Sequence, residues 1–360
     1  MIPASQPVQR PRDAKLLVIS GNQSGDSAGN LRHVPRSSWI EFLHAGDLVV
    51  ANDAATIPAS LLGIHIPTQS AIEVRLAGRR SLNPEDVHEF FAVVFGEGDF
   101  HTRTENRPAP PHIKAGDGLK LGPLSATVAR LLGHPRLILI DFEGSADQIW
   151  AGLARHGRPI QYAHLDVPLS LWDVWTPIAG VPAAFEPPSA GFAIDWNIVA
   201  ALRARGVGFS TITHAAGISS TGDPALDAHL PFDEAYLIPE AAAEAIGRTR
   251  AFGGRVIAIG TTVVRALEHA ASAGTIRAGE GVATQRIGRG TQLRAVDAIF
   301  SGTHEPGTSH YELLRAFADD RILELATRQL DLHGYRTHEF GDSVMLEAAF
   351  PHHYRAGRAA

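Results

Sequence analysis

The chain of 360 residues contains no cysteine. This absence excludes disulfide bonds, thiolate nucleophiles, iron–sulfur clusters and zinc sites built on cysteine. Long apolar runs are also missing: no stretch approaches the roughly 20 residues that a membrane-spanning helix needs, and the first residues lack the apolar segment of a signal peptide. The sequence therefore predicts a cytoplasmic protein that does not enter a membrane.

Basic residues are fewer than acidic ones, with 32 Lys and Arg against 38 Asp and Glu, which gives a formal net charge of -6. This balance weighs against a broad basic surface for nucleic acid, although a local basic patch is compatible with a negative total. Hydrophobic residues make up 44% of the chain, enough for a substantial core. The length predicts about two domains.

Two parts of the chain differ in pattern. Residues 61–140 hold short β-rich runs separated by Gly, Pro and Asn, which is typical of a small antiparallel barrel or sandwich. After residue 145, apolar runs alternate with helical patterns; Ser145 and Asp195 are expected to cap two of the helices, and Pro239 to open another. This alternation favours an α/β domain with a largely parallel sheet.

The segment 297–317, DAIFSGTHEPGTSHYELLRAF, places His304, Glu305 and His310 in one polar loop. Ser309 and Glu312 have the spacing of a capping box and predict the start of a helix. Free amide donors beside titratable side chains indicate a place for an anionic group and for proton transfer. The alternative is an ordinary capped helix with solvated histidines.

A second strand, turn and helix pattern follows in residues 255–268. Gly260, Thr261 and Thr262 place amides and hydroxyls at the start of a helix, which suits a phosphate, a carboxylate or a ribose hydroxyl. The glycine spacing is that of neither a Walker A loop nor a GxGxxG motif. A plain turn capped by threonine is the alternative, and Arg265 either pairs with an anion or lies on the surface.

Isolated polar and small residues mark further candidate positions. Asn52 and Asp53 follow a buried strand, a common address for ligand sites in α/β folds. His214 precedes a small flexible run, Gly191 lies in PPSAGF, and Asp342 precedes a strand, where it either orients a catalytic histidine or is a turn aspartate. The chain has no GxSxG and no HExxH motif, so neither a serine hydrolase nor a catalytic metal is expected.

Taken in order, several segments together resemble the S-adenosylmethionine:tRNA ribosyltransferase-isomerase family of queuosine biosynthesis, over nearly the whole chain. They are GDLVVANDAATIPASL (46–61), GRPIQY (157–162), PSAGF (188–192), the loop of His214, GGRVIAIGTTVVRALE (253–268), residues 296–317 and YRTHEFGDSVML (335–346). GGRVIAIGTT and GRPIQY are the most specific of these.

The resemblance implies a fold, a reaction and a set of partners. The fold is α/β: a larger domain of residues 1–60 and 165–360, interrupted by a small antiparallel β-barrel domain of residues 61–164. The enzyme would use S-adenosylmethionine as a ribosyl donor and a 7-aminomethyl-7-deazaguanine base in tRNA as acceptor. It would form epoxyqueuosine and release adenine and methionine, with neither a metal nor an organic cofactor.

The resemblance also suggests roles for individual residues. His304 and Glu305 are expected to act as acid or base, Asp53 to hold ribose or the attacking amine, and Asp342 to assist catalysis. The residues expected to bind substrate are Asn52, Gly191, His214, Gly260, Thr261, Thr262, Arg265, Ser309 and His310.

This chain departs from the family pattern as a divergent member. The usual motif NDTRVIPARL reads NDAATIPASL over residues 52–61, so both arginines are absent, while the loop near residue 304 gains Glu305 and His310. Arginine binds phosphate bidentately, so these losses and the net charge weigh against tRNA. Two alternatives stay open: the same donor with a small-molecule acceptor, or a non-catalytic protein that binds S-adenosylmethionine or a nucleoside.

Overall fold

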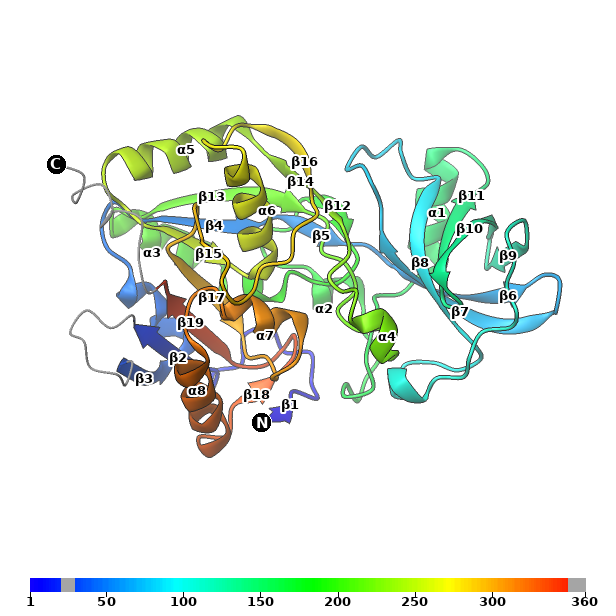
Figure 1. Cartoon of the computed structure of the whole chain (residues 1–360), viewed down its shortest axis with the longest axis horizontal. Helices are drawn as coiled ribbons and strands as arrows, with labels where there is room; N and C mark the ends of the chain where they lie inside the picture. The colour runs from blue at the N-terminus through cyan, green and yellow to red at the C-terminus, as the bar shows by residue number, and fades with distance from the viewer. Residues whose placement is uncertain (21–29, 349–360) are drawn as a thin grey trace.

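The strands form two main units in the computed structural model, which describes residues 1–20 and 30–348. One unit is a nine-stranded sheet flanked by helices, and the other is a closed six-stranded barrel. The two units lie side by side along the long axis of the molecule, and the barrel is formed by a continuous middle part of the chain (Figure 1). The prediction of an α/β domain interrupted by an antiparallel barrel is thereby confirmed.

The large sheet is parallel at its centre and mixed toward its edges. In spatial order its strands are β16 (Gly279–Ala283), β14 (Glu234–Ile238), β13 (Gly208–His214), β4 (Leu48–Asn52), β15 (Val256–Ile259), β17 (Ala298–Gly302), β19 (Ser343–Glu347), β2 (Lys15–Ser20) and β3 (Asn30–Pro35). Strands β13, β4, β15 and β17 are parallel, whereas β14, β16, β19 and β3 each pair antiparallel with an inner neighbour. The expected largely parallel sheet is therefore wrong at the edges, because alternation along the chain does not reveal strand direction.

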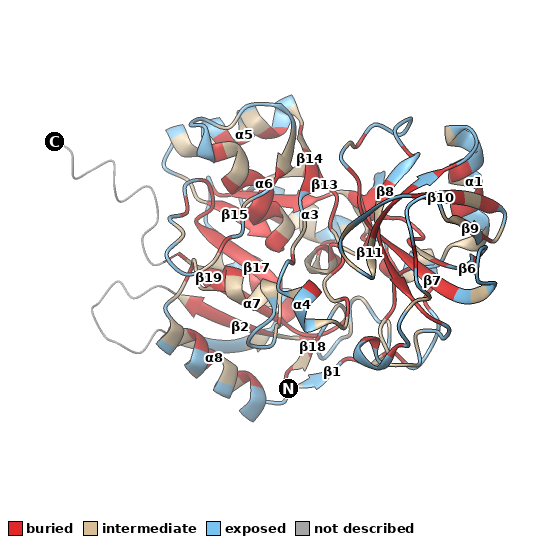
Figure 2. Cartoon of the chain, turned by 45° about the vertical axis from the view of Figure 1, so that its right-hand side comes forward, coloured by how far each residue is buried: buried red, intermediate tan, exposed pale blue. Residues whose placement is uncertain are grey.

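Strand β4 shows how both faces of the sheet are buried. Leu48 and Val50 join one apolar cluster, while Val49 and Ala51 join another, since successive side chains of a strand point to opposite faces. The first cluster includes side chains of α5 (Glu240–Ala251), α6 (Thr261–Ser272), α7 (Ser309–Leu314) and α8 (Asp320–Leu332), and the second those of η1 (Arg36–Phe42) and α3 (Trp196–Ala204). Figure 2 shows the resulting buried layer between exposed helix faces.

The barrel closes through antiparallel pairs only, so it leaves no free sheet edge. Its strands are β6 (Ser60–His65), β7 (Ser70–Gly78), β8 (Glu89–Phe95), β9 (Gly118–Leu121), β10 (Leu124–His134) and β11 (Leu137–Phe142). Helix α1 (Ala146–His156) buries Ile149 and Leu153 in the barrel core, and Ser145 with Gln148 forms the predicted capping box. The limits 61–164 for the inserted domain stay a prediction.

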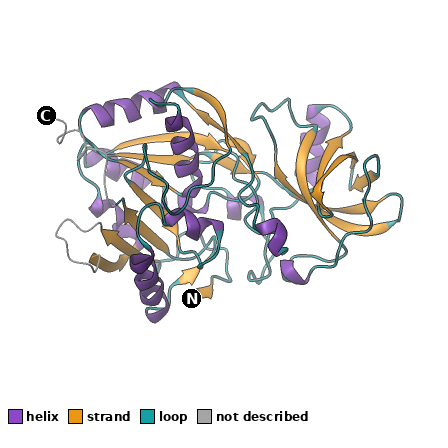
Figure 3. Cartoon of the chain, in the orientation of Figure 1, coloured by secondary structure: helices purple, strands orange, loops and turns teal. Residues whose placement is uncertain are grey.

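The two units share a continuous core where they meet. Strands β5 (Ala54–Thr56) and β12 (Val181–Ala184) pair parallel to each other, and Ala54 and Ala184 belong to the same apolar cluster as the barrel strands. Figure 3 shows mainly loops and short helices at this junction. The remaining short elements are β1 (Ile2–Pro3), η2 (Thr104–Asn106), α2 (Leu171–Val174), η3 (Ser189–Ala193), α4 (Pro224–Asp227) and β18 (Arg336–Thr337).

Two predicted helix starts are displaced by one residue. Thr308, not Ser309, caps α7, and its hydroxyl accepts from the amide of Tyr311 at 3.2 Å. Glu312 pairs with Arg315 at 2.8 Å instead of closing a capping box. Pro239 is the N-cap of α5, and Glu240 is its first residue. Among the described residues, no helix is both long and apolar enough to cross a bilayer.

Candidate active site

One pocket lies at the N-terminal end of α6, and we call it the α6 pocket. It is lined by Ala216, Gly217, Ile218, Ser219, Pro231, Glu234, Thr261, Thr262, Arg265, Ile287, Ser309, His310 and Leu313. The structure thus brings Thr261, Thr262, Arg265, Ser309 and His310, which the sequence predicted as substrate-binding residues, around one hollow. Helix α7 has only 6 residues, so its own N-terminus is a weaker anion site than that of α6.

Helix α6 presents unpaired amide groups to this pocket. Gly260, at φ 90°, makes the sharp turn from β15 into the helix, and its amide donates to the carbonyl of Phe300 at 2.8 Å. No side chain caps the helix. Within the described chain, the amides of Thr261, Thr262 and Val263 donate to no other protein group. Three donors at a positive dipole end are therefore available to an anion.

Arg265 forms a buried ion pair on the wall of the α6 pocket. Its side chain is 4% exposed, so the surface alternative is wrong. The guanidinium donates to Glu234 and to the carbonyl of Ala283, the latter at 2.9 Å, while its Nε has no partner among the described groups. Burial lowers the pKa of Arg265 to about 10, which leaves it charged at neutral pH. The carboxylate of Glu234 also accepts from the amide of Gly217 at 2.6 Å.

His214 stands behind this ion pair. It is fully buried, and its Nε2 lies 3.5 Å from the nearer carboxylate oxygen of Glu234. Burial, together with the charge of Arg265, holds the pKa of His214 well below its usual range, so the ring is neutral. It does not line the pocket and acts on it only through Glu234.

A second pocket, the junction pocket, lies where a barrel loop meets the larger unit. Its lining residues are Pro3, Arg103, Thr104, Glu105, Tyr162, Ala163, His164, Ser219, Ser220, Glu305, His338 and Glu339. Of the predicted catalytic residues, Glu305 lies here. Ser219 lines both pockets, so the two hollows adjoin at this residue.

A buried carboxyl group, Glu186, lies beside the junction pocket. The hydroxyl of Tyr162 donates to it and accepts from the amide of Ser220 at 3.3 Å. Burial raises the pKa of Glu186 to about 7, and the charge of Glu339 adds to the rise. Glu186 therefore exchanges a proton near neutral pH, as a general acid or base must.

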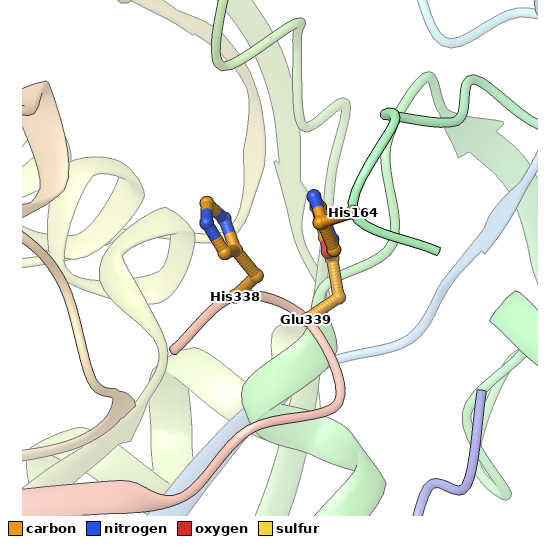
Figure 4. A group of neighbouring side chains, drawn as sticks. All are labelled: His164, His338 and Glu339. Atoms are coloured by element: carbon orange, nitrogen blue, oxygen red, sulfur yellow. The ribbon is translucent and has the colours of Figure 1, made fainter. Parts of the chain in front are cut away.

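His164, His338 and Glu339 form a cluster on two separate segments (Figure 4). Each offers one possible ligand atom for a metal ion, and these atoms all lie within 4.8 Å of one another. Among the described residues, no other group of three or more His, Asp or Glu side chains meets this condition. His164 Nε2 lies 3.2 Å from Glu339, and the two imidazoles stack 4.2 Å apart at 16°. Lone pairs of nearly parallel stacked rings do not converge on one point, so the geometry fits a hydrogen-bonded stack better than a metal centre. The expectation of no metal stays a prediction.

The two histidines predicted on the loop before α7 are stacked on each other. The rings of His304 and His310 lie 4.7 Å apart at 13°, and His304 Nε2 is 3.1 Å from the hydroxyl of Ser301. Desolvation lowers the pKa of His310 to about 4 and that of His304 well below its usual range. Both rings are neutral at pH 7, which weighs against an acid and leaves a lone pair on each ring for a hydrogen bond or a proton, although the lowered pKa also makes each ring a weaker base.

Asp53 and Asp342 lie outside the lining of both pockets. The carboxylate of Asp53 accepts from the hydroxyls of Thr211 at 2.8 Å and Thr213 at 2.7 Å. Asp342 is 1% exposed and accepts from the amides of Lys15 and Arg336, both at 2.8 Å. It therefore fastens the start of β2 to the start of β18, and it has no hydrogen bond to a histidine among the described residues. Its catalytic role stays a prediction.

Three more predicted residues belong to the scaffold. The amide side chain of Asn52 donates to the carbonyl of His214 and accepts from its amide, each at 2.9 Å, which joins β4 to β13. A Cβ on Gly191 would lie 3.0 Å from Thr176, so its small size permits close packing. Gly260 acts through the turn that it makes. None of the three lines a described pocket.

Comparisons with known proteins identify the family of this chain. Residues 2–346 match the family model described as "Queuosine biosynthesis protein". The chain belongs to this family. It is 32% identical to an S-adenosylmethionine:tRNA ribosyltransferase-isomerase of Sorangium cellulosum (strain So ce56), over 95% of this chain and 94% of the relative. It is 30% identical to the enzyme of the same name from Azoarcus sp. (strain BH72), over 95% and 93%.

A solved structure also resembles the chain. It is an S-adenosylmethionine tRNA ribosyltransferase from Thermotoga maritima, with a TM-score of 0.49 and 23% identity over 96% of each chain. Family membership therefore rests on the sequence matches. It confirms the predicted family of transferase-isomerase enzymes.

Proposed function

We propose that the protein transfers and isomerises the ribosyl group of S-adenosylmethionine onto a 7-aminomethyl-7-deazaguanine base in tRNA. The products would be epoxyqueuosine in the tRNA, adenine and methionine. The observation that carries the proposal is that the α6 pocket and the junction pocket meet at Ser219, with proton-exchanging groups beside the second. The names of the related enzymes support the same reaction.

Side chains in and near the two pockets suit the two proton transfers of this reaction. His310 lines the α6 pocket, Glu186 lies beside the junction pocket, and His304, which lines neither pocket, stacks on His310. A base must remove a proton next to the positive sulfur, and an acid must protonate the departing adenine. The neutral imidazoles of His304 and His310 can accept a proton, whereas the carboxyl group of Glu186, with a pKa of about 7, can donate one. Glu305 is exposed at the rim of the junction pocket and is the second candidate for proton transfer.

A small-molecule acceptor is the second candidate function, and the charge of the junction pocket favours it. Glu105, Glu305 and Glu339 line this pocket, and among the described residues Arg103 is the one Lys or Arg that does. The guanidinium of Arg103 lies 3.8 Å from the carboxylate of Glu105, which offsets its charge. With the net charge of -6, this lining attracts an amine and repels phosphates. The same donor chemistry would then act on a free amine-bearing base.

Mass spectrometry of adenine and methionine release tests the proposal. The full chain would be incubated at low salt with S-adenosylmethionine and either tRNA carrying the aminomethyl base or the free base, because phosphate contacts weaken with salt. Equimolar adenine and methionine with a mass gain on the tRNA is the expected result. Release of adenine and methionine only with the free base would favour the small-molecule acceptor. Binding of S-adenosylmethionine without any such release would contradict an enzymatic function.

His304→Ala tests the proposed base within this reaction. We expect adenine release to fall about 100-fold, the usual contribution of a positioned base, while donor binding persists. His88→Ala is the matched control, because His88 lies in the barrel near Phe142 and lines neither pocket. Unchanged turnover in His304→Ala would remove His304 from the mechanism.

A further inference from the structure

We propose that the α6 pocket binds the amino-acid end of the donor as a zwitterion. Its carboxylate would sit at the first turn of α6, and its ammonium group at Glu234. This inference rests on the proposed function, because it takes S-adenosylmethionine as the ligand, and it adds which part of that ligand each pocket holds.

The carboxylate position follows from two independent features. Helix α6 has 12 residues, no side-chain cap and no acidic residue in its first turn, so its dipole and its free amides are uncompensated. Arg265 lines the same pocket, is 4% exposed, and keeps an unpartnered Nε among the described groups. Backbone donors and a buried cation therefore face one space, which suits a ligand carboxylate.

The ammonium position follows from Glu234. A carboxylate offers about four lone-pair positions. Those of Glu234 accept from Arg265 and from the amide of Gly217, and one oxygen lies 3.5 Å from Nε2 of His214. Because Glu234 lines the pocket, its carboxylate is within reach of a ligand ammonium group there. Because the carboxylate of Glu234 offsets the charge of Arg265 on the pocket wall, a lone anion such as phosphate would gain little from Arg265 and would also meet the negative charge of Glu234. A zwitterion would satisfy both charges, so the wall selects an amino acid.

The rest of the pocket suits the aliphatic chain between the amino acid and the sulfur. Ile218, Ile287 and Leu313 supply apolar wall between the polar groups. The α6 pocket is narrower than the junction pocket. The narrower pocket would take the aliphatic methionine part, and the ribose and adenine would lie on the junction-pocket side of Ser219.

Titration calorimetry on the full chain with donor analogues tests this assignment. The ligands are S-adenosylmethionine, its decarboxylated analogue and its deaminated analogue. Each lost charge-assisted contact should raise Kd by about 10- to 100-fold. Equal Kd values for the donor and its decarboxylated analogue would overturn the carboxylate assignment, and equal values for the donor and its deaminated analogue would overturn the ammonium assignment.

The variant Glu234→Gln assigns the ammonium contact to its residue. It should raise the Kd of S-adenosylmethionine about 10-fold or more and leave the Kd of the deaminated analogue within about twofold. Glu244→Gln, on the exposed face of α5 and in neither pocket, should keep the wild-type preference for the ammonium group. Equal effects of Glu234→Gln on both ligands would contradict the assignment. If Glu234→Gln does not fold, the analogue series on the wild-type chain still decides.

The outcomes also separate this inference from the proposed function. Turnover of S-adenosylmethionine with equally tight binding of all three ligands would sink the zwitterion site alone. Discrimination among the ligands without adenine release would leave the zwitterion site standing and sink the transferase. If none of the three ligands binds, both the zwitterion site and the transferase function are contradicted.

Discussion

At the scale of single residues, the protonation states of buried side chains decide which of them can act. Glu186 carries a proton through most of the acidic range because burial raises its pKa to about 7. His304 and His310 carry none at neutral pH, because desolvation lowers their pKa values. Under the proposed reaction, burial would make Glu186 the proton donor and the histidines the proton acceptors.

Glu186→Gln should change the pH dependence of stability. The folded pKa of about 7 lies above the ordinary value of 4.5, so the stability that this group contributes is present below 4.5 and is lost as pH rises through 7. The stability of the wild type relative to Glu186→Gln should therefore fall by about 2 kcal/mol between roughly pH 5.5 and pH 8. Urea unfolding of both proteins measures it, and a pH-independent difference would refute the raised pKa.

His310→Gln should act in the opposite direction. The folded pKa of about 4 lies below the ordinary 6.5, so the stability associated with the neutral ring is present above 6.5 and is lost as pH falls toward 4. The wild type should lose about 1–2 kcal/mol relative to His310→Gln between roughly pH 7 and pH 5, with allowance for partial exposure. If the free energy of unfolding of the two proteins changes with pH in the same way, the ring of His310 is solvated.

The sequence indicated several of these residues but not their protonation states. His310, Thr262 and Arg265 could be chosen because their types and positions suit an anion near helix starts. Tyr162 lay in GRPIQY, and His338 with Glu339 in YRTHEFGDSVML, yet nothing local assigned them chemistry. Glu186 meets Tyr162 only because the chain returns from the barrel at that point, and no spacing along the sequence encodes that contact.

At the scale of elements, the turn from β15 into α6 forms one side of the α6 pocket. Gly260 adopts φ 90°, where an added Cβ is strained and would lie 3.4 Å from the side chain of Ala190. The turn aims the first amides of α6 at the pocket. The sequence predicted this strand, turn and helix correctly, whereas the starts of α5 and α7 were displaced by one residue. Pro239 stands just before the first helical residue of α5, and Thr308 instead of Ser309 caps α7.

Gly260→Ala should therefore destabilise the protein by about 1–2 kcal/mol and also weaken donor binding. Gly253→Ala is the matched control, since Gly253 also has a positive φ of 74° but no atom within 4 Å of an added Cβ. The control should lose stability alone. Urea midpoints measure the loss of stability, and calorimetry measures donor binding. Equal donor affinity in both variants would show that the turn at Gly260 does not contribute to donor binding.

At the scale of the whole molecule, a polar network ties the barrel to the larger unit. The guanidinium of Arg75, on β7, lies 5.6 Å from the ring of Tyr162, whose hydroxyl contacts Glu186 and the loop of Ser219 and Ser220. The inserted barrel thus positions the proton-exchanging group of the junction pocket. Composition predicted the barrel and its place in the chain, but the network depends on tertiary contacts that sequence patterns do not specify.

Tyr162→Phe should lower turnover without weakening donor binding in the α6 pocket. We expect adenine release to fall about 10- to 100-fold, because Glu186 loses its hydrogen-bond donor, while the Kd of the donor stays within about threefold. Tyr236→Phe is the control, since Tyr236 contacts His269 at 2.9 Å and lines neither pocket. Equal losses of turnover in both variants would indicate a general effect on folding.

A crystal structure of the full chain with S-adenosylmethionine would test most directly whether the two pockets form one donor site. The expected result is a donor carboxylate at the amides of Thr261, Thr262 and Val263, with the ammonium group at Glu234. The ribose and adenine would pass Ser219 into the junction pocket. A donor bound outside both pockets, or one that leaves the first turn of α6 untouched, would contradict the assignment.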